Sequence, residues 1–134
     1  MLKVIEHGAV FEIRMDKAPA NAMDMAFIKA LHAVHREVCG HGAAAVVISG
    51  RPGMFSGGLD VPALMGLEHA AMLEFWVGFM DLMQALASSP VPVTAAITGH
   101  SPAGGSVLAL HCDYRVAAAG DFKIGLNEVQ VGLP

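Results

Sequence analysis

The stretch VTAAITGHSPAGGSVLALH (93–111) passes from an apolar, β-branched run through a glycine-rich turn into a helical pattern. An earlier stretch, FSGGLD (55–60), follows a second apolar run in the same way. A strand that ends in a turn, and a helix that begins there, leave main-chain N–H groups without partners, and the start of a helix favours negative charge. Two such groups converging on one point would hold a carbonyl oxygen as it becomes an oxyanion.

Apolar runs alternate with helical spacing along the rest of the chain. We expect strands over 2–7, 9–15, 43–49, 93–98, 114–118 and 122–124. We expect helices over 24–40, 68–87 and 103–111. The run 43–49 is continuously apolar, which is typical of a strand covered on both faces. Strands that alternate with helices predict one α/β domain (1–134) with a mostly parallel sheet.

Composition narrows the class of protein. The chain has 134 residues, 54% of them hydrophobic, and a net charge of −4 without a cluster of basic residues, which argues against nucleic acid as a partner. No apolar run approaches the length that a bilayer span requires, and the N-terminus lacks the pattern of a signal peptide. We therefore expect a cytoplasmic protein, with an organelle not excluded, whose Cys39 and Cys112 are reduced and buried.

We consider three other kinds of functional site: a nucleotide phosphate loop, a serine nucleophile and a metal site. A nucleotide phosphate loop is rejected because neither of the usual glycine signatures is present. A serine hydrolase is disfavoured because Ser101 is followed by Pro102, which has no N–H to donate to an oxyanion. A metal site is not expected, because His32 and His35 share a helix face but lack further ligands at a recognisable spacing.

The ordered strings VVISGRPGMFSGGLD (46–60), GHSPAGGSVLALHCDYRVA (99–117) and IGLNEVQVGL (124–133) resemble the crotonase, or enoyl-CoA hydratase/isomerase, superfamily. Within it the chain is most similar to 3,2-enoyl-CoA isomerases. The resemblance covers essentially the whole chain. It implies a crotonase-like (ClpP/crotonase) spiral of ββα units, of which only the N-terminal part is present.

The resemblance also implies a set of site residues. The N–H groups of Leu59 and Gly104 match the two oxyanion-hole donors, and Glu128 matches the downstream catalytic glutamate. The groove for the coenzyme A moiety and the acyl chain is matched by Ala18, Ala20, Asn21, Ser56, Gly57, Gly58, Leu59, Asp60, Gly104 and Val107. No cofactor is implied, because coenzyme A is part of the substrate.

One departure from the family pattern decides the expected reaction. Hydratases of this family carry a second glutamate at the position of Val107, and a valine cannot hold a water. Moving a double bond from position 3 to position 2 needs only one base, which here is Glu128, and an apolar pocket for which Val107, Phe55 and methionines of the 68–87 helix are candidates. The alternatives are another crotonase reaction, such as hydration or acyl-CoA hydrolysis, or an inactive fragment or binding subunit completed by a second chain.

The resemblance implies a longer protein. Family members are about twice as long, and in them the C-terminal half completes the acyl pocket, contributes a cation to the coenzyme A phosphates and packs trimers together. We therefore expect the full-length chain to form a homo-oligomer, a trimer or a dimer of trimers. Pro134 would stand in the first turn of a further helix.

Overall fold

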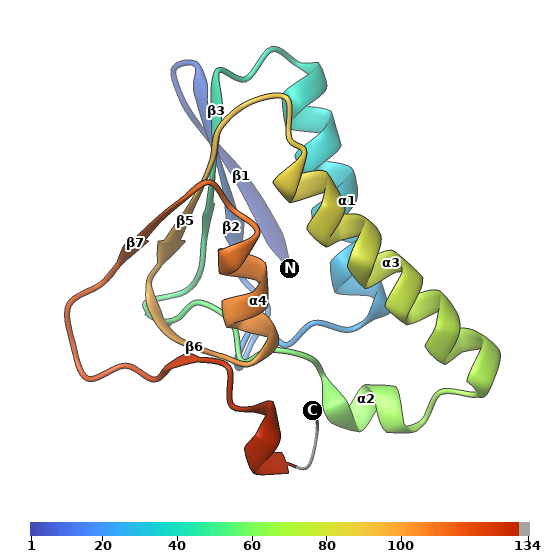
Figure 1. The fold of residues 1–134 in the computed structure, drawn as a ribbon. Coiled ribbons are helices and arrows are strands. Elements are labelled where there is room, and N and C mark those ends of the chain that lie inside the picture. The colour runs from blue at the N-terminus through green and yellow to red at the C-terminus, as the bar shows by residue number, and fades with distance from the viewer. Residues whose placement is uncertain (132–134) are drawn as a thin grey trace.

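A computed structural model describes residues 1–131, and its larger sheet has five strands. These strands are β1 (Leu2–His7), β2 (Val10–Met15), β3 (Ala45–Ser49), β5 (Val93–Ile97) and β7 (Tyr114–Ala117), in the spatial order β1-β2-β3-β5-β7 (Figure 1). β1 and β2 form an antiparallel hairpin, and every other pair in this sheet is parallel. The mostly parallel α/β sheet is therefore confirmed.

A second, three-stranded sheet runs in the order β4-β6-β8. It contains β4 (Gly53–Met54), β6 (Gly99–Pro102) and β8 (Ile124–Gly125), and both of its pairs are parallel. Each of the last three strands of the larger sheet is followed along the chain by one of these short strands and then by a helix. This repetition is the expected spiral of ββα units.

In residues 1–131, four α-helices and one 3₁₀ turn connect or follow the strands. The structure has α1 (Met25–Gly40), α2 (Val61–Met65), α3 (His69–Ala87), α4 (Gly104–Leu110) and a 3₁₀ turn (Glu128–Val131). α1 and α3 lie side by side (Figure 1), and they approach closely where the Gly78 backbone faces Ile28. Asp24 caps α1 as its sequence position predicts, since its carboxylate accepts the Phe27 N–H at 2.8 Å.

Side chains of the larger sheet alternate between a buried and an open face. Ile13, Ile48 and Ala95 are fully buried on the face that packs against α1. Ala45 and Val47, which alternate with Val46 and Ile48 along β3 and so point to the opposite face, are only half-buried. Ala44 is exposed as well, so the expectation that residues 43–49 are covered on both faces is wrong for the described residues.

The remaining differences from the sequence-based expectation concern short elements. α2, β4 and β6 were not expected, and the predicted strand 122–124 lies instead at 124–125. Two to five residues contain too few side chains to establish a hydrophobic period, so such elements escape pattern analysis. The expectation about Pro134 falls outside the described residues.

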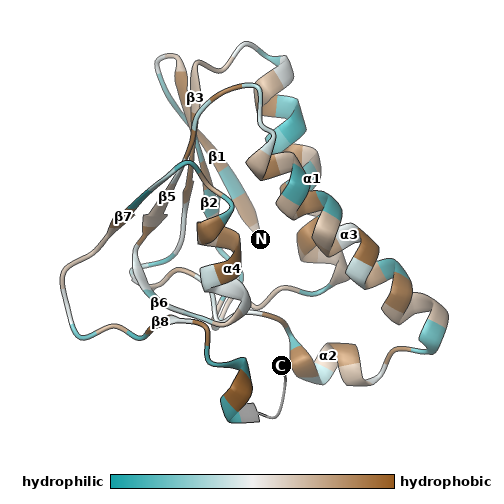
Figure 2. Cartoon of the chain, viewed as in Figure 1, coloured by the Kyte–Doolittle hydropathy of each residue, from teal (hydrophilic) through white to brown (hydrophobic). Residues whose placement is uncertain are grey.

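α3 combines an apolar surface with a role in the core. By length and composition it is apolar enough to cross a membrane, the one such helix among residues 1–131. Its inner side nevertheless contributes five buried side chains to the core: Phe75, Phe79, Leu82, Met83 and Leu86. Figure 2 shows that its hydrophobic colouring is not confined to one side, and Leu73, Trp76, Val77 and Met80 are exposed.

Candidate active site

Leu59 lies in an extended segment whose hydrogen bonds alternate in direction. Its neighbours pair with Met23 on one side: the Met23 N–H donates to the Gly58 carbonyl at 2.8 Å, and the Asp60 N–H donates to the Met23 carbonyl at 3.0 Å. In extended backbone successive N–H groups point to opposite sides, so the Leu59 N–H is directed away from Met23. The Leu59 N–H therefore takes no part in the pairing with Met23.

Gly104 packs directly against this segment. A methyl group added to Gly104 would lie 3.3 Å from Leu59 N and 3.3 Å from Gly58 Cα. Gly104 is the first residue of α4, where an N–H has no acceptor within the helix. The structure thus brings the two main-chain amides at 59 and 104 together, although they are far apart in sequence.

Ala103, which precedes Gly104, adopts a backbone conformation unusual for a residue with a side chain. Its φ is 48° and its ψ is −124°, a region that favours glycine. Its N–H donates to the Gly125 carbonyl at 2.9 Å. This turn sets the direction in which Gly104 and the rest of α4 begin.

Asn21 and Ser56 hold the first glycine-rich turn from inside the protein. Both side chains are fully buried. The Asn21 side-chain amide donates to the carbonyls of Met15 (3.1 Å) and Phe55 (2.9 Å). The Ser56 hydroxyl donates to the Asn21 carbonyl at 3.0 Å and accepts the Gly58 N–H at 3.2 Å. These polar atoms are occupied by the protein itself, so both side chains shape the turn rather than face a ligand.

Lys17 joins the same turn to the start of α1. Its ammonium group donates to Asp24 at 2.6 Å and to the Ala22 carbonyl at 2.8 Å, and it lies 3.5 Å from the Asp60 carboxylate. Burial of Asp24 would raise its pKa, but the hydrogen bonds from Lys17 and from the Phe27 N–H outweigh burial and hold the pKa below its ordinary value. Asp60 also caps α2 by accepting the Ala63 N–H.

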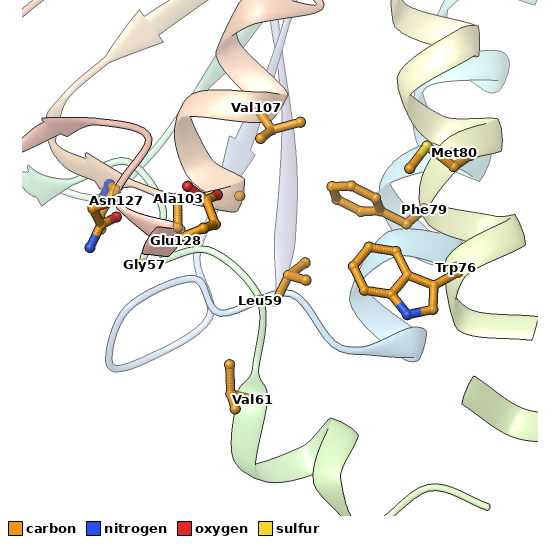
Figure 3. Close-up of a pocket in the computed structure, with 12 residues that line it drawn as sticks. Gly57, Leu59, Val61, Trp76, Phe79, Met80, Ala103, Val107, Asn127 and Glu128 are labelled. Atoms are coloured by element: carbon orange, nitrogen blue, oxygen red, sulfur yellow. The ribbon is translucent and has the colours of Figure 1, made fainter. Parts of the chain in front are cut away.

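A cavity of about 650 Å³ opens beside the two amides. Figure 3 shows Leu59 and Val61 along it, with aromatic and methionine side chains of α3 on one side and α4 on the other. Its lining consists of Gly57, Leu59, Val61, Trp76, Phe79, Met80, Pro102, Ala103, Gly104, Val107, Asn127 and Glu128. Most of these groups are apolar, so an apolar chain that enters the cavity passes both the amides and a single carboxylate.

Glu128 is the acidic residue of this lining. It is half-buried at the start of the 3₁₀ turn, and Figure 3 shows it beside Ala103, across the cavity from Trp76 and Phe79. It also lines a second cavity of about 420 Å³ together with Val107, Leu126 and Val129. Its neighbour Asn127 has a buried side-chain oxygen without a hydrogen-bond partner among residues 1–131.

The sequence-predicted site residues divide into two groups. Gly57, Leu59, Gly104, Val107 and Glu128 line the cavity. The remaining six are not in the lining. Gly58 is buried, Ala20 accepts a hydrogen bond from the Gly57 N–H of the turn, Asp60 belongs to the turn, and Asn21 and Ser56 are structural. Ala18 does not line the cavity either.

The sequence-based prediction missed some of the residues that line the cavity, and it placed one residue, Phe55, in the lining wrongly. Trp76, Phe79 and Asn127 line the cavity but were not predicted to do so. Trp76 and Phe79 lie about one turn apart on the same helix, and this spacing could have indicated a shared aromatic surface. Met80 lines it as expected of the 68–87 methionines. Phe55, expected in the pocket, is instead fully buried and is not in the lining.

Three further residues that the sequence singled out are structural. Ser101 is fully buried, which leaves its hydroxyl no route to the cavity as a nucleophile. His35 is buried beside Cys39 and Ser89, and burial lowers its pKa. Burial raises the pKa of the Cys112 thiol to about 12, as expected of an inert buried cysteine, whereas Cys39 is only partly buried.

The sequence of this chain is similar to those of enoyl-CoA hydratases and isomerases. A family model described as "Enoyl-CoA hydratase/isomerase" matches residues 6–134. Mitochondrial enoyl-CoA delta isomerase 1 from Rattus norvegicus is 42% identical over 89 residues, which are 66% of this chain and 31% of the relative. The human peroxisomal bifunctional enzyme is 33% identical over 128 residues, 95% of this chain and 17% of the relative.

Solved structures of enoyl-CoA isomerases and hydratases have the same fold as this chain. The human mitochondrial Δ3-Δ2-enoyl-CoA isomerase superposes with a TM-score of 0.91 at 32% identity, covering 98% of this chain and 53% of that one. The enoyl-CoA hydratase from Thermoplasma volcanium superposes with a TM-score of 0.90 at 26% identity, again covering 53% of that chain. The chain therefore spans about half the length of these solved relatives and corresponds to the N-terminal part of their fold. This chain belongs to the enoyl-CoA hydratase/isomerase, or crotonase, family.

Proposed function

We propose that the protein shifts the double bond of a 3-enoyl-CoA to position 2. The observation that carries this proposal is the pair of amides at Leu59 and Gly104 beside a cavity whose lining contains one carboxylate, Glu128. The isomerases among the similar proteins support it, whereas the hydratases among them support only the broader acyl-CoA chemistry.

In the proposed reaction the thioester oxygen accepts hydrogen bonds from the Leu59 and Gly104 N–H groups. Glu128 removes a proton from C2, and the electron pair moves into a dienolate whose negative charge rests on the thioester oxygen. The same carboxyl group then returns the proton to C4, which leaves the double bond between C2 and C3. Atoms and charge balance without a metal or a further cofactor. Donors aimed at such an oxygen are worth about 3–4 kcal/mol each.

Val107 supports isomerisation over hydration. Hydration requires two groups that hold and activate a water, and the Val107 side chain in the cavity wall can do neither. We therefore expect conversion of a 3-enoyl-CoA with little hydration of the 2-enoyl isomer. Hydration faster than isomerisation would contradict this assignment and favour the hydratase alternative, for which Val107→Glu is the informative variant.

Glu128→Gln tests the role of the carboxylate. Loss of a positioned acid–base group lowers kcat by about 10²- to 10⁴-fold, and the uncharged variant should still bind acyl-CoA. Asp121→Asn is the matched control, because it makes the same charge change at an exposed position on the segment that leads to Glu128. Near-normal turnover by Glu128→Gln would place the base elsewhere.

We also propose that the full-length protein assembles into a homo-oligomer, a trimer or a dimer of trimers, in which acyl-CoA binds each subunit. The support is the number of large apolar side chains that the described chain exposes, among them Met65, Met80 and Val129. The native mass, compared with 13.9 kDa for one chain, tests this. A single-chain mass combined with no acyl-CoA turnover would favour the alternative of a binding subunit that needs a second chain.

A further inference from the structure

Ser106 is a buried residue of α4 that no part of the reaction uses. It is 5% exposed, and its hydroxyl has two partners on different strands. It donates to the carbonyl of Ser101 on β6 and accepts the Gly125 N–H of β8 at 2.9 Å. One side chain thus ties α4 to both β6 and β8.

The Gly125 end of this connection leads directly to Glu128. Gly125 is the last residue of β8, and the 3₁₀ turn starts at Glu128, three residues later. Both main-chain groups of Gly125 are bound by the beginning of α4, its N–H by the Ser106 hydroxyl and its carbonyl by the Ala103 N–H. The segment 103–106 therefore contains the Gly104 amide and also anchors the strand that leads to Glu128.

Two of the side chains beyond Gly125 offer little additional anchoring. Leu126 is 60% exposed and Val129 is 79% exposed. Among the described residues, the backbone hydrogen bond of the turn runs from the Gln130 N–H to the Asn127 carbonyl, so it does not connect the turn to the rest of the protein. The position of the Glu128 carboxylate thus depends on where Gly125 is held.

From this arrangement we propose that Ser106 is a positioning residue for Glu128. Its hydroxyl fixes the Gly125 amide and so keeps the carboxylate at a set distance from the Gly104 amide. The catalytic part of this proposal rests on the proposed isomerase function, whereas the anchoring part stands on the structure of the chain alone.

Ser101 provides a matched control. It is another buried serine in the same region, but its hydroxyl has no hydrogen-bond partner among the described residues. Ser101→Ala removes the same atoms as Ser106→Ala, from a position where the hydroxyl anchors nothing. A general effect of removing a buried hydroxyl should therefore appear in both variants.

Amide hydrogen exchange on the purified protein tests the anchoring. We expect Ser106→Ala to speed exchange of the Gly125 N–H by about fivefold or more, the effect of losing one hydrogen bond, and Ser101→Ala to leave it unchanged. Ser106→Cys keeps a side chain of similar shape with weaker hydrogen bonding and should lie between the two. Unchanged Gly125 exchange in both Ser106 variants would overturn the proposal.

Turnover of a 3-enoyl-CoA tests the consequence. We expect Ser106→Ala to lower kcat by about tenfold while KM changes less than twofold, because binding groups stay in place and only the base moves. Faster Gly125 exchange with unchanged kcat would also overturn the positioning role. If the unmodified protein has no isomerase turnover, the proposed function fails, and Gly125 exchange still decides whether Ser106 anchors the strand.

Discussion

The two sides of the candidate site are built differently. The amide side, residues 55–60 and 103–105, is buried or half-buried throughout: Ser56 is fully inaccessible, and Gly104 and Gly105 are buried with it. The carboxylate side, residues 123–130, is mostly exposed and is held mainly through Lys123 and Gly125. An oxyanion site needs donors that do not move, whereas a base that carries a proton between two carbons has to reach both. The contrast in burial is consistent with the roles that the proposed reaction gives to the two sides.

Gly105→Ala should have the largest effect, because it breaks the amide side. A methyl group there would collide with the Ser56 carbonyl and lie 3.0 Å from the Ser101 hydroxyl. We expect the free energy of unfolding, measured by urea titration, to fall by about 4 kcal/mol or more. Gly78→Ala is the control, since its methyl group would make an ordinary contact of 3.5 Å with Ile28. Equal stability of the two variants would contradict the tight packing of the amide side.

Asn21→Ala comes next. It removes the donor to the Met15 and Phe55 carbonyls and leaves both buried groups unpaired, and it places alanine at a φ of 50°. We expect a loss of about 3 kcal/mol in urea unfolding. Asn127→Ala, on the carboxylate side, should change stability by less than about 1 kcal/mol. A similar cost for both asparagines would remove the difference between the two sides.

Glu12 lies in neither the amide side nor the carboxylate side of the site, and it makes the free energy of unfolding depend on pH. It lies on β2, on the sheet face opposite the core residue Ile13, and its carboxylate accepts hydrogen bonds from Arg14 and Ser49. Burial would raise its pKa, but these bonds and the one with His7 outweigh burial and lower the pKa from 4.5 to about 2. Because the folded-state pKa is lowered, the stabilisation is present above pH 4.5 and is lost as the pH falls toward 2.

Glu12→Gln should therefore cost about 2 kcal/mol at pH 7, and the difference from the unmodified protein should shrink between pH 4.5 and 2. Acyl-CoA affinity should stay unchanged, because Glu12 does not line the cavity. Glu6→Gln, an exposed change on β1, is the control for charge alone. A stability difference that does not vary over this pH range would show that the carboxylate is not stabilised by its neighbours.

Ala103 lies where the two sides meet, and changing it should have the smallest effect. Its positive φ costs an alanine roughly 1–2 kcal/mol, and the greater freedom of glycine in the unfolded chain offsets about half of this. We expect Ala103→Gly to raise the free energy of unfolding by about 0.5 kcal/mol. Ala103→Val, whose branched side chain tolerates this φ poorly, should lower it clearly. If valine is tolerated as well as glycine, the turn is not constrained as described.

Pattern analysis succeeded where an element is long enough to show a period. The helices 24–40 and 68–87 and the strands at 2–7 and 93–98 agree with the structure to within a few residues. The family match was carried by the ordered strings around Gly58, Gly104 and Glu128. Pattern analysis failed at β4, β6 and α2, since such short elements are defined by their neighbours and have no period of their own.

The amino-acid sequence by itself determined the class of fold and the glycine-rich turns, because these follow from local spacing and residue type. Its resemblance to a known family supplied the candidate residues Leu59, Gly104 and Glu128. Only the tertiary structure decided that Asn21 and Ser56 are spent on internal hydrogen bonds, that Trp76 and Phe79 line the cavity and that Ser106 reaches Gly125. Such contacts join residues far apart along the chain, and their partners depend on how strands and helices pack rather than on any local pattern.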